Sequence, residues 1–159
     1  ILSLPYPGGP HIDRLAQQGN AVLQFSQSRI GGYDYSFSGL KTGILYTLRD
    51  KLKENPNYLE ENICDIAASV QKAVVDSLIS KFEKAIKDTG IKNIAIAGGV
   101  SANSLLRQSI QSLGKKYNCE VFIPKFSYTT DNAAMVASAA LFKYMDNEFA
   151  DLSVAAYAR

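Results

Sequence analysis

Hydrophobic positions in the first half of the chain repeat with the period of an α-helix. One stripe, spaced by fours, predicts a helix that Ser38 caps and that ends near Pro56. A longer stripe predicts a second helix of roughly 40 Å, which begins near residue 57 or 62 and continues to Asp88, before Gly90. The two stripes consist of Leu40, Ile44, Leu48 and Leu52, and of Ile63, Ala67, Val70, Val74, Leu78, Phe82 and Ala85.

Beyond Gly90 the pattern changes to short, continuous apolar runs. Ile94–Ala97 is typical of a strand buried on both faces, and Val121–Ile123 of a second strand. Ser101 can cap a helix between them, so the order predicts a β-α-β unit with parallel strands and a right-handed crossover. A last helix, rich in small residues, is expected over Asp131–Ala137.

Prolines and glycines shape the start of the chain. Pro5–Pro10 predicts a tight, stiff loop, and a short helix follows over His11–Gln18, with Gly19 as its left-handed cap. The alternating aromatic residues of Tyr33–Phe37 favour a short strand or extended segment.

The length of 159 residues suits one domain, and 47% apolar with 20% charged residues is typical of a globular protein. We expect a helix-rich part over 1–90, a β-α-β-α part over 91–145 and a terminal tail over 146–159. No apolar run reaches the roughly 18 residues of a membrane-spanning helix, so a soluble protein is expected. The chain opens without Met and without a secretory signal, which suggests a piece of something longer.

Charge and cysteines exclude several classes of protein. The 17 basic and 15 acidic residues are interleaved, which is too even for a nucleic-acid-binding stripe. Cys64 and Cys119 lie far apart, so neither a disulfide framework nor a four-cysteine zinc site can form. Both are expected to be reduced core cysteines of a cytosolic protein.

The stretch from Ile94 to Asn103 is the most informative candidate for chemistry. A predicted strand turns through Gly98 and Gly99 into a helix, where paired glycines let a ligand approach the backbone and open N–H groups favour an anionic or polar group. These features favour a nucleotide site, although such a turn also suits tight packing without a ligand. The glycines do not form a G-x-G-x-x-G motif, and the chain has no G-x-x-x-x-G-K-[ST] loop.

Ile96–Asn103 resembles the adenosine motif of the actin, sugar kinase and Hsp70 superfamily, and in its wording it resembles the TsaD family closely. These are the threonylcarbamoyltransferases of tRNA, formerly called glycoproteases or O-sialoglycoprotein endopeptidases. The resemblance covers nearly the whole chain. Further blocks match in the family's order, and they are Tyr6–Pro10, Tyr35–Thr42, Asp65–Ser69, Val74–Asp76 and Thr130–Met135.

The resemblance implies a fold and a reaction. The fold would be one α/β lobe of the actin-like (ASKHA, ribonuclease H-like) architecture with helical insertions, from the carboxy-terminal half of the enzyme. The whole enzyme would transfer threonylcarbamoyl from threonylcarbamoyl-adenylate to N6 of the adenosine next to the tRNA anticodon, without a nucleophilic serine or cysteine. The implied partners are tRNA and the TsaB and TsaE proteins, in the cytoplasm and without a membrane.

The resemblance also assigns residues to the site. Gly9, Gly98 and Gly99 would hold the adenylate substrate, Asn103 would contact its nucleotide part, and Asp131 would bind a divalent metal, iron or zinc. No residue of this chain is expected to act as a catalytic group. From the residues alone, Asp131 and Asn103 are also typical helix-start residues that bond their own backbone.

This chain lacks part of the family's metal site. Family members use two histidines of an H-x-x-x-H motif, whereas the only histidine here is His11, which is not a family metal position. The chain would therefore supply at most one of three protein ligands, and we expect this half to be inactive alone.

Three alternatives remain at this point. They are a non-catalytic nucleotide-binding or protein-docking lobe, a small-molecule kinase of the same superfamily, which would need upstream phosphate loops, and a metallopeptidase, as the family was formerly labelled. Ser38-x-x-Lys41 and Lys41-Thr42-Gly43 also spell two elements of penicillin-recognising acylases. Those elements face each other across a cleft and cannot share one lysine, so this match is rejected.

Overall fold

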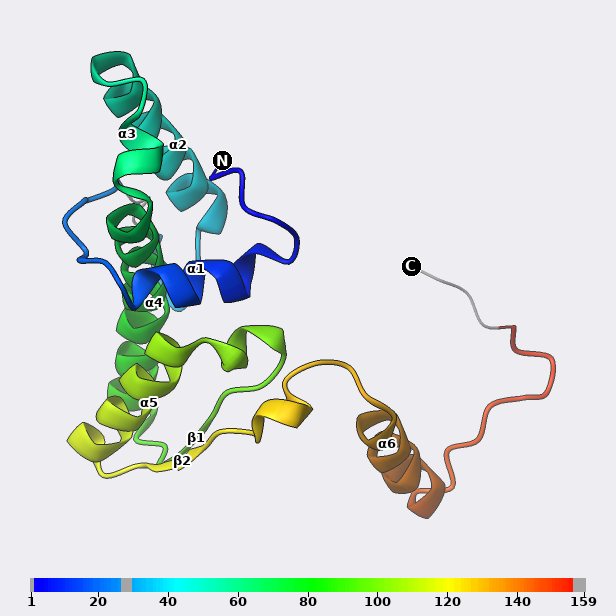
Figure 1. The fold of residues 1–159 in the computed structure, drawn as a ribbon. Helices are drawn as coiled ribbons and strands as arrows, with labels where there is room; N and C mark the ends of the chain where they lie inside the picture. Colours follow the sequence, from blue (N-terminus) through cyan, green and yellow to red (C-terminus); the bar gives the residue numbers. More distant parts are fainter. Residues whose placement is uncertain (1, 27–29, 156–159) are drawn as a thin grey trace.

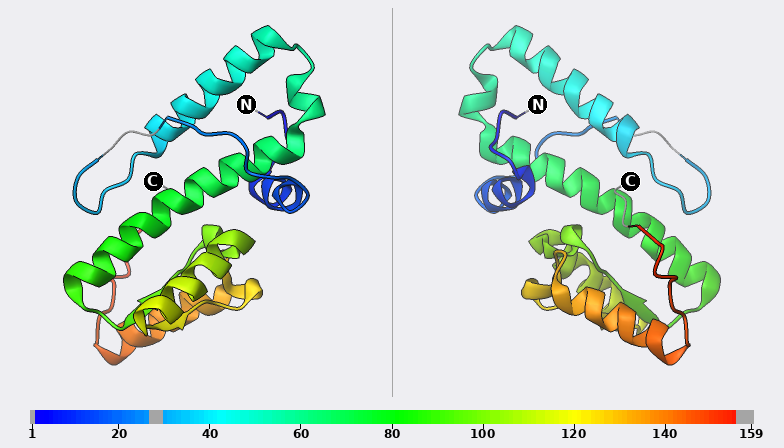
Figure 2. Two further views of the ribbon diagram at one scale, coloured as in Figure 1. Left: turned by 90° about the vertical axis from the view of Figure 1, so that its left-hand side faces the viewer. Right: turned by 90° about the vertical axis from the view of Figure 1, so that its right-hand side faces the viewer.

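The long helix α4 (Ile63–Thr89) is the central support of the fold, as the computed structural model shows for residues 2–26 and 30–155 (Figure 1). It has 27 residues and ends at Gly90, whose φ of 68° is left-handed. The predicted long helix and its glycine stop are therefore confirmed. Helices α1 (Gly8–Ala16) and α5 (Ser104–Tyr117) pack against α4, and α1 lies across it (Figure 2).

Two apolar clusters hold the helices together. One joins α2 (Phe37–Glu54) to the start of α4. The other joins the second half of α4 to α5 and the sheet. Their buried members are Leu40, Ile44, Leu48 and Ile66 in the first cluster, and Val75, Ile86, Ile94, Leu106, Ile110 and Leu113 in the second. The predicted stripe of α2 supplies three buried members, Leu40, Ile44 and Leu48. The predicted stripe of α4 contributes only partly buried members to the clusters, and the buried α4 residues of the clusters, Ile66, Val75 and Ile86, lie outside it. A short helix, α3 (Tyr58–Glu61), connects α2 to α4.

The sheet consists of two short strands, β1 (Asn93–Ala95) and β2 (Glu120–Phe122), which pair in parallel with Ile94 opposite Val121. This confirms the predicted parallel β-α-β unit. The prediction of a strand buried on both faces was wrong. Ile94 is buried, but Ala95 and Phe122, which alternate onto the other face, are exposed. Helices α4 and α5 pack on the Ile94 face only.

The first residues fold differently from the prediction. Gly8, Gly9 and Pro10 form the first turn of α1 instead of a loop, and the peptide bond before Pro7 is cis. Gly19 is not left-handed; a Cβ there would lie 2.2 Å from the backbone carbon of Cys64, so close packing explains this glycine.

No strand forms over Tyr33–Phe37, for which the sequence favoured a short strand or an extended segment. Phe37 begins α2, and the ring of Tyr35 stacks on that of Phe37 at 5.5 Å between centroids. The cap is also two residues earlier than predicted, because the Oγ of Ser36, not of Ser38, accepts from the N–H of Gly39.

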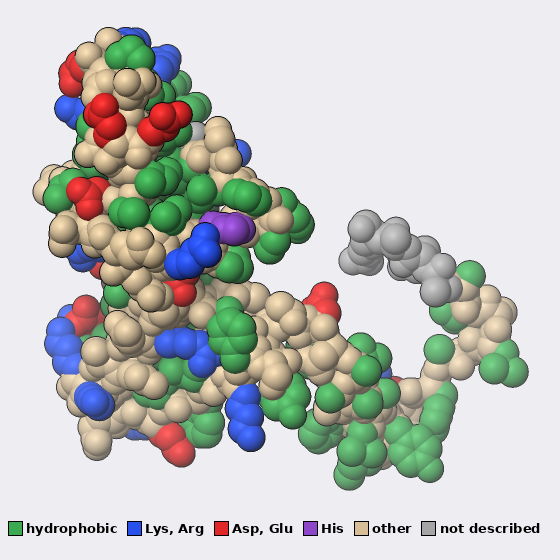
Figure 3. All heavy atoms as spheres, viewed as in Figure 1, with side chains coloured by type: hydrophobic (Ala, Val, Ile, Leu, Met, Phe, Trp, Pro, Cys, Tyr) green, Lys and Arg blue, Asp and Glu red, His purple; other side chains and the backbone are tan. Residues whose placement is uncertain are grey.

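Helix α6 (Ala133–Met145) extends away from the rest of the chain (Figure 1). None of its residues is buried, although most are apolar, and hydrophobic side chains cover the side seen in Figure 3. Its large exposed side chains are Met135, Val136, Leu141, Phe142, Tyr144 and Met145. None of the helices in residues 2–26 and 30–155 is long and apolar enough to cross a membrane.

Candidate functional site

The glycine turn that follows β1 is an open loop with a backbone that needs glycine. Gly98 has φ 76° and ψ 179°, and the 3₁₀ turn η1 (Gly99–Ala102) follows it. A Cβ on Gly98 or Gly99 would meet no atom within 4 Å, so the turn is accessible from outside. Ser101, fully buried, closes the turn by donating from its Oγ to the carbonyl of Gly98 at 2.7 Å. The sequence suggested Ser101 as the cap of α5, but Ser101 lies within η1 and does not cap that helix.

Asn103 is the residue that caps α5. Its Oδ1 accepts from the N–H of Leu106 at 2.9 Å. Its Nδ2 donates to Oε1 of Gln71 at 2.8 Å and, at 3.4 Å, to Oδ1 of Asp13. The structure therefore shows the backbone-capping role that the residue type alone suggested. Contact between Asn103 and a substrate stays a prediction. The hydrogen bonds of its side-chain amide hold that amide in a fixed orientation.

A polar cluster around Asp13 ties three helices together beside the turn. The Asp13 carboxylate accepts from the Oγ of Ser104 at 2.6 Å and from its N–H at 3.3 Å. Gln71, which is 6% exposed, brings α4 into the same cluster through Asn103. Sequence reasoning missed Asp13 and Gln71, because their positions, 90 and 32 residues before Asn103, carry no local pattern.

Gly9 lies in the first turn of α1, the helix that carries Asp13. A Cβ at this position would meet nothing within 4 Å, and the residue is exposed. No packing requirement therefore explains the glycine. The start of α1, the turn η1 and the turn η2 (Phe126–Tyr128) all lie on the side of the molecule that faces α6 (Figure 1).

Asp131 is exposed and stands just before α6. Its neighbour Asn132 caps that helix, with Oδ1 accepting from the N–H of Met135 at 3.1 Å. Across the described ranges, no group of three or more His, Cys, Asp or Glu side chains could hold a metal ion. Because iron and zinc sites take at least three protein ligands, the described residues do not fit such a site by themselves.

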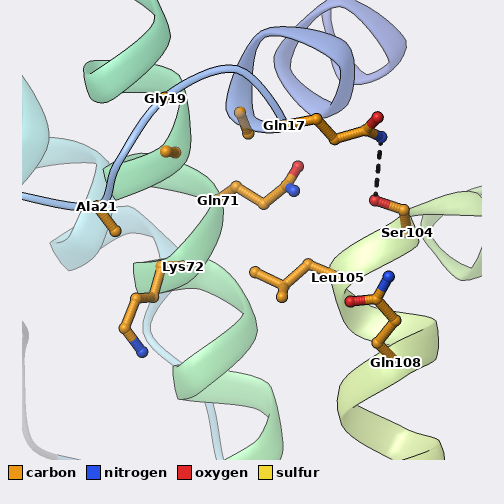
Figure 4. A pocket seen from close by; sticks show the side chains of 10 residues that line it. Gln17, Gly19, Ala21, Gln71, Lys72, Ser104, Leu105 and Gln108 are labelled. Atoms are coloured by element: carbon orange, nitrogen blue, oxygen red, sulfur yellow. Dashed lines mark hydrogen bonds between the residues drawn. The ribbon is translucent and has the colours of Figure 1, made fainter.

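A groove of about 500 Å³ lies between the end of α1, α4 and α5, beside the Asp13 cluster, whose Gln71 and Ser104 also line it (Figure 4). Polar side chains, including Gln17, Gln71, Lys72 and Gln108, line it together with apolar ones. The Nε2 of Gln17 donates to the Oγ of Ser104 across its rim, at 3.5 Å. None of the five site residues expected from the sequence lines this groove.

Fold and site together define a mostly helical protein with a small parallel sheet, in which a β-α-β unit presents a glycine turn at the end of a strand. The family model described as "TsaD: tRNA N6-adenosine threonylcarbamoyltransferase" matches residues 1–138. This match covers most of the chain, which therefore belongs to the TsaD family.

Curated relatives agree with the family match. Proteins named tRNA N6-adenosine threonylcarbamoyltransferase are 52% identical in Riemerella anatipestifer and 49% identical in Porphyromonas gingivalis, each over 160 aligned positions that include 100% of this chain. The relative from Carboxydothermus hydrogenoformans is 45% identical over 99% of the chain. The chain spans 46–47% of the length of these relatives.

Proposed function

We propose that this chain is the carboxy-terminal half of a tRNA N6-adenosine threonylcarbamoyltransferase and forms one lobe of an actin-like (ASKHA) fold. The observation that carries the proposal is the family match over residues 1–138. The parallel β-α-β unit, with its open glycine turn after β1, supports it.

The proposed reaction transfers threonylcarbamoyl from its adenylate to N6 of the adenosine beside the tRNA anticodon. The N6 amine of the adenosine would attack the carbamoyl carbon and form the new C–N bond. The bond between that carbon and the phosphate oxygen would break, AMP would leave with the bonding electron pair, and the amine would lose one proton to solvent. Gly9, Gly98 and Gly99 would let the adenylate approach the backbone, since no side chain stands in its way. Asn103, fixed by its bonds to Gln71 and Asp13, would orient the nucleotide part.

Asp131 would contribute one carboxylate to a metal site whose other ligands come from the remaining half of the protein. When bound, an iron or zinc ion would act as a Lewis acid on the transferred carbonyl. The exposed position of Asp131 before α6, on an open side of the chain, suits a ligand that a second lobe completes.

Uncovered apolar surface supports the idea that this chain is one part of a larger fold. Parallel sheets are normally covered on both faces, yet Phe122 is 50% exposed on the open face. An isolated helix as short as α6 is only marginally stable in water, and its apolar side chains have no cover here. We infer that the remaining half covers α6 and the open face. In the complete enzyme, tRNA and the TsaB and TsaE proteins are the proposed partners.

Gly9→Ala tests the substrate role of the α1 turn. In the complete protein we expect threonylcarbamoyl transfer to tRNA to fall at least about tenfold, because a methyl group would displace the adenylate from the backbone. Stability should not fall, since the site is open and Gly→Ala at a compatible position stabilises by about 0.4–1 kcal/mol. Gly31→Ala, another open position, is the control and should keep full activity. Equal activity of both variants would contradict the assignment of Gly9.

A further inference from the structure

Arg107, in the first turn of α5, connects the two loops that follow the strands of the sheet. Its Nε donates to the carbonyl oxygen of Ser101 at 2.6 Å, and its Nη2 donates to that of Pro124 at 2.9 Å. Its guanidinium carbon lies 5.9 Å from the centre of the Phe126 ring. Ser101 belongs to the glycine turn after β1, whereas Pro124 and Phe126 belong to the segment after β2.

The bonding of Arg107 uses its charge on main-chain oxygens. It forms no ion pair with a carboxylate in residues 2–26 and 30–155. Hydrogen bonds from a guanidinium to carbonyl groups are stronger than neutral ones, and the planar fork holds both acceptors in a fixed relation. Lysine has a single ammonium group at its end and cannot reproduce this planar, two-nitrogen geometry.

The two linked loops stand where ligands bind in parallel α/β sheets, beyond the carboxyl ends of the strands. The loop after β1 contains Gly98 and Gly99. The segment after β2 continues through the buried Thr129, whose Oγ1 donates to the carbonyl of Phe126 at 2.8 Å, to Asp131. Arg107 thus fixes the distance between the two loops that carry most of the proposed site.

We propose that Arg107 is a positioning residue of the transferase: it holds the glycine turn against the segment that leads to Asp131 and so sets the shape of the adenylate site. It acts through main-chain atoms and is not a catalytic residue. The kinetic part of this inference rests on the proposed function, whereas the link between the loops rests on the structure alone.

Arg107→Lys in the complete protein tests the proposal with two readouts. We expect kcat/KM to fall about tenfold to a hundredfold, mainly through a higher KM for threonylcarbamoyl-adenylate, because small displacements of a substrate site have effects of this size. Amide hydrogen exchange should become faster over residues 98–102 and 124–130 and stay unchanged in the α4–α5 core. Arg107→Ala should behave similarly, with partial recovery of KM on addition of guanidinium ion.

Arg49→Lys is the matched control, because Arg49 also lies over an aromatic ring, that of Tyr46 at 4.9 Å, but on α2 and away from the sheet. It should leave KM and exchange unchanged. The proposal is overturned if Arg107→Lys matches this control, or if exchange accelerates equally through the whole core. If the unaltered complete protein does not transfer threonylcarbamoyl, the proposed function fails, and the exchange data alone decide whether Arg107 links the loops.

Discussion

Gly98 and Gly99, in the turn after β1, differ in whether the backbone requires a glycine. Gly98 has a backbone conformation, φ 76° and ψ 179°, that is essentially restricted to glycine. Gly99 has no left-handed φ, and a Cβ there would meet open space. The conformation of the turn therefore requires glycine at position 98, whereas at position 99 the backbone would accept a side chain.

Gly98→Ala should therefore destabilise the chain by about 1–3 kcal/mol, the usual cost of holding a side chain in such a conformation. Gly99→Ala should cost nothing or stabilise slightly, because its site accepts a methyl group. Urea unfolding of both variants measures the difference. Equal destabilisation by the two substitutions would contradict this explanation, because only Gly98 has a backbone conformation that requires glycine.

Individual residues of the site were only partly predictable from the sequence. The glycine turn stood out because a strand, a glycine pair and a helix follow one another within ten positions. The cluster of Asp13, Gln71 and Asn103 did not, because its members meet only when α1, α4 and α5 pack. Arg107 was missed for a related reason, since its acceptors are backbone carbonyls, which no sequence pattern marks.

Pairs of helices are joined by polar contacts as well as by the apolar clusters. Glu83 on α4 accepts hydrogen bonds from the hydroxyl of Tyr117 and from Lys116 on α5, and also from Lys87. The Tyr117 bond, followed by the two lysines, lowers the pKa of Glu83 from 4.5 to about 2. The charged form of Glu83 is thus favoured by folding.

The depressed pKa gives a pH prediction for the α4–α5 contact. The stabilisation is fully present above the unfolded pKa of 4.5 and is lost as the pH falls through about 2. Glu83→Gln removes the ionisable group, so stability should fall less steeply with acid between these values than in the unaltered chain. Thermal unfolding at a series of pH values measures the slope. The exposed Glu60→Gln on α3 is the control, and an identical slope for the two variants would disprove the link.

Elements with a strong helical repeat were predicted well. The stripe of α2 points into the first cluster, because burial of one face dictates its spacing. In α4 the helix itself was predicted, but its buried members of the two clusters, Ile66, Val75 and Ile86, lie beside the predicted stripe. The alternating aromatic residues of Tyr33–Phe37 favoured a short strand or an extended segment, whereas the rings of Tyr35 and Phe37 stack on each other at the start of α2. The start of α1 was misplaced because glycine and proline at a first helical turn resemble a loop in sequence.

At the scale of the whole molecule, the described residues leave apolar surface uncovered. The sheet has two strands, one open face and an uncovered apolar helix nearby in the sequence. The sequence identified the family but could not indicate which face of β1 stays open, because a short apolar run does not show which of its faces other elements cover.

The substitution Phe142→Ala tests whether α6 is covered in the complete protein. In this chain Phe142 is 66% exposed, so the substitution should change the free energy of unfolding by less than about 0.5 kcal/mol. In the complete protein, where we infer that α6 is covered, the same change should cost about 3–5 kcal/mol. Chemical unfolding of both forms gives the two values. A small effect in both would contradict the inferred cover.

The central proposal is that this chain supplies one wall of an adenylate site that the other half of the protein completes. Calorimetric titration of threonylcarbamoyl-adenylate into the chain alone and into the complete protein tests it most directly. We predict saturable binding to the complete protein, weakened by Gly9→Ala, and no detectable binding to the chain alone. Equally tight binding to both, or absence of binding to the complete protein, would contradict the proposal.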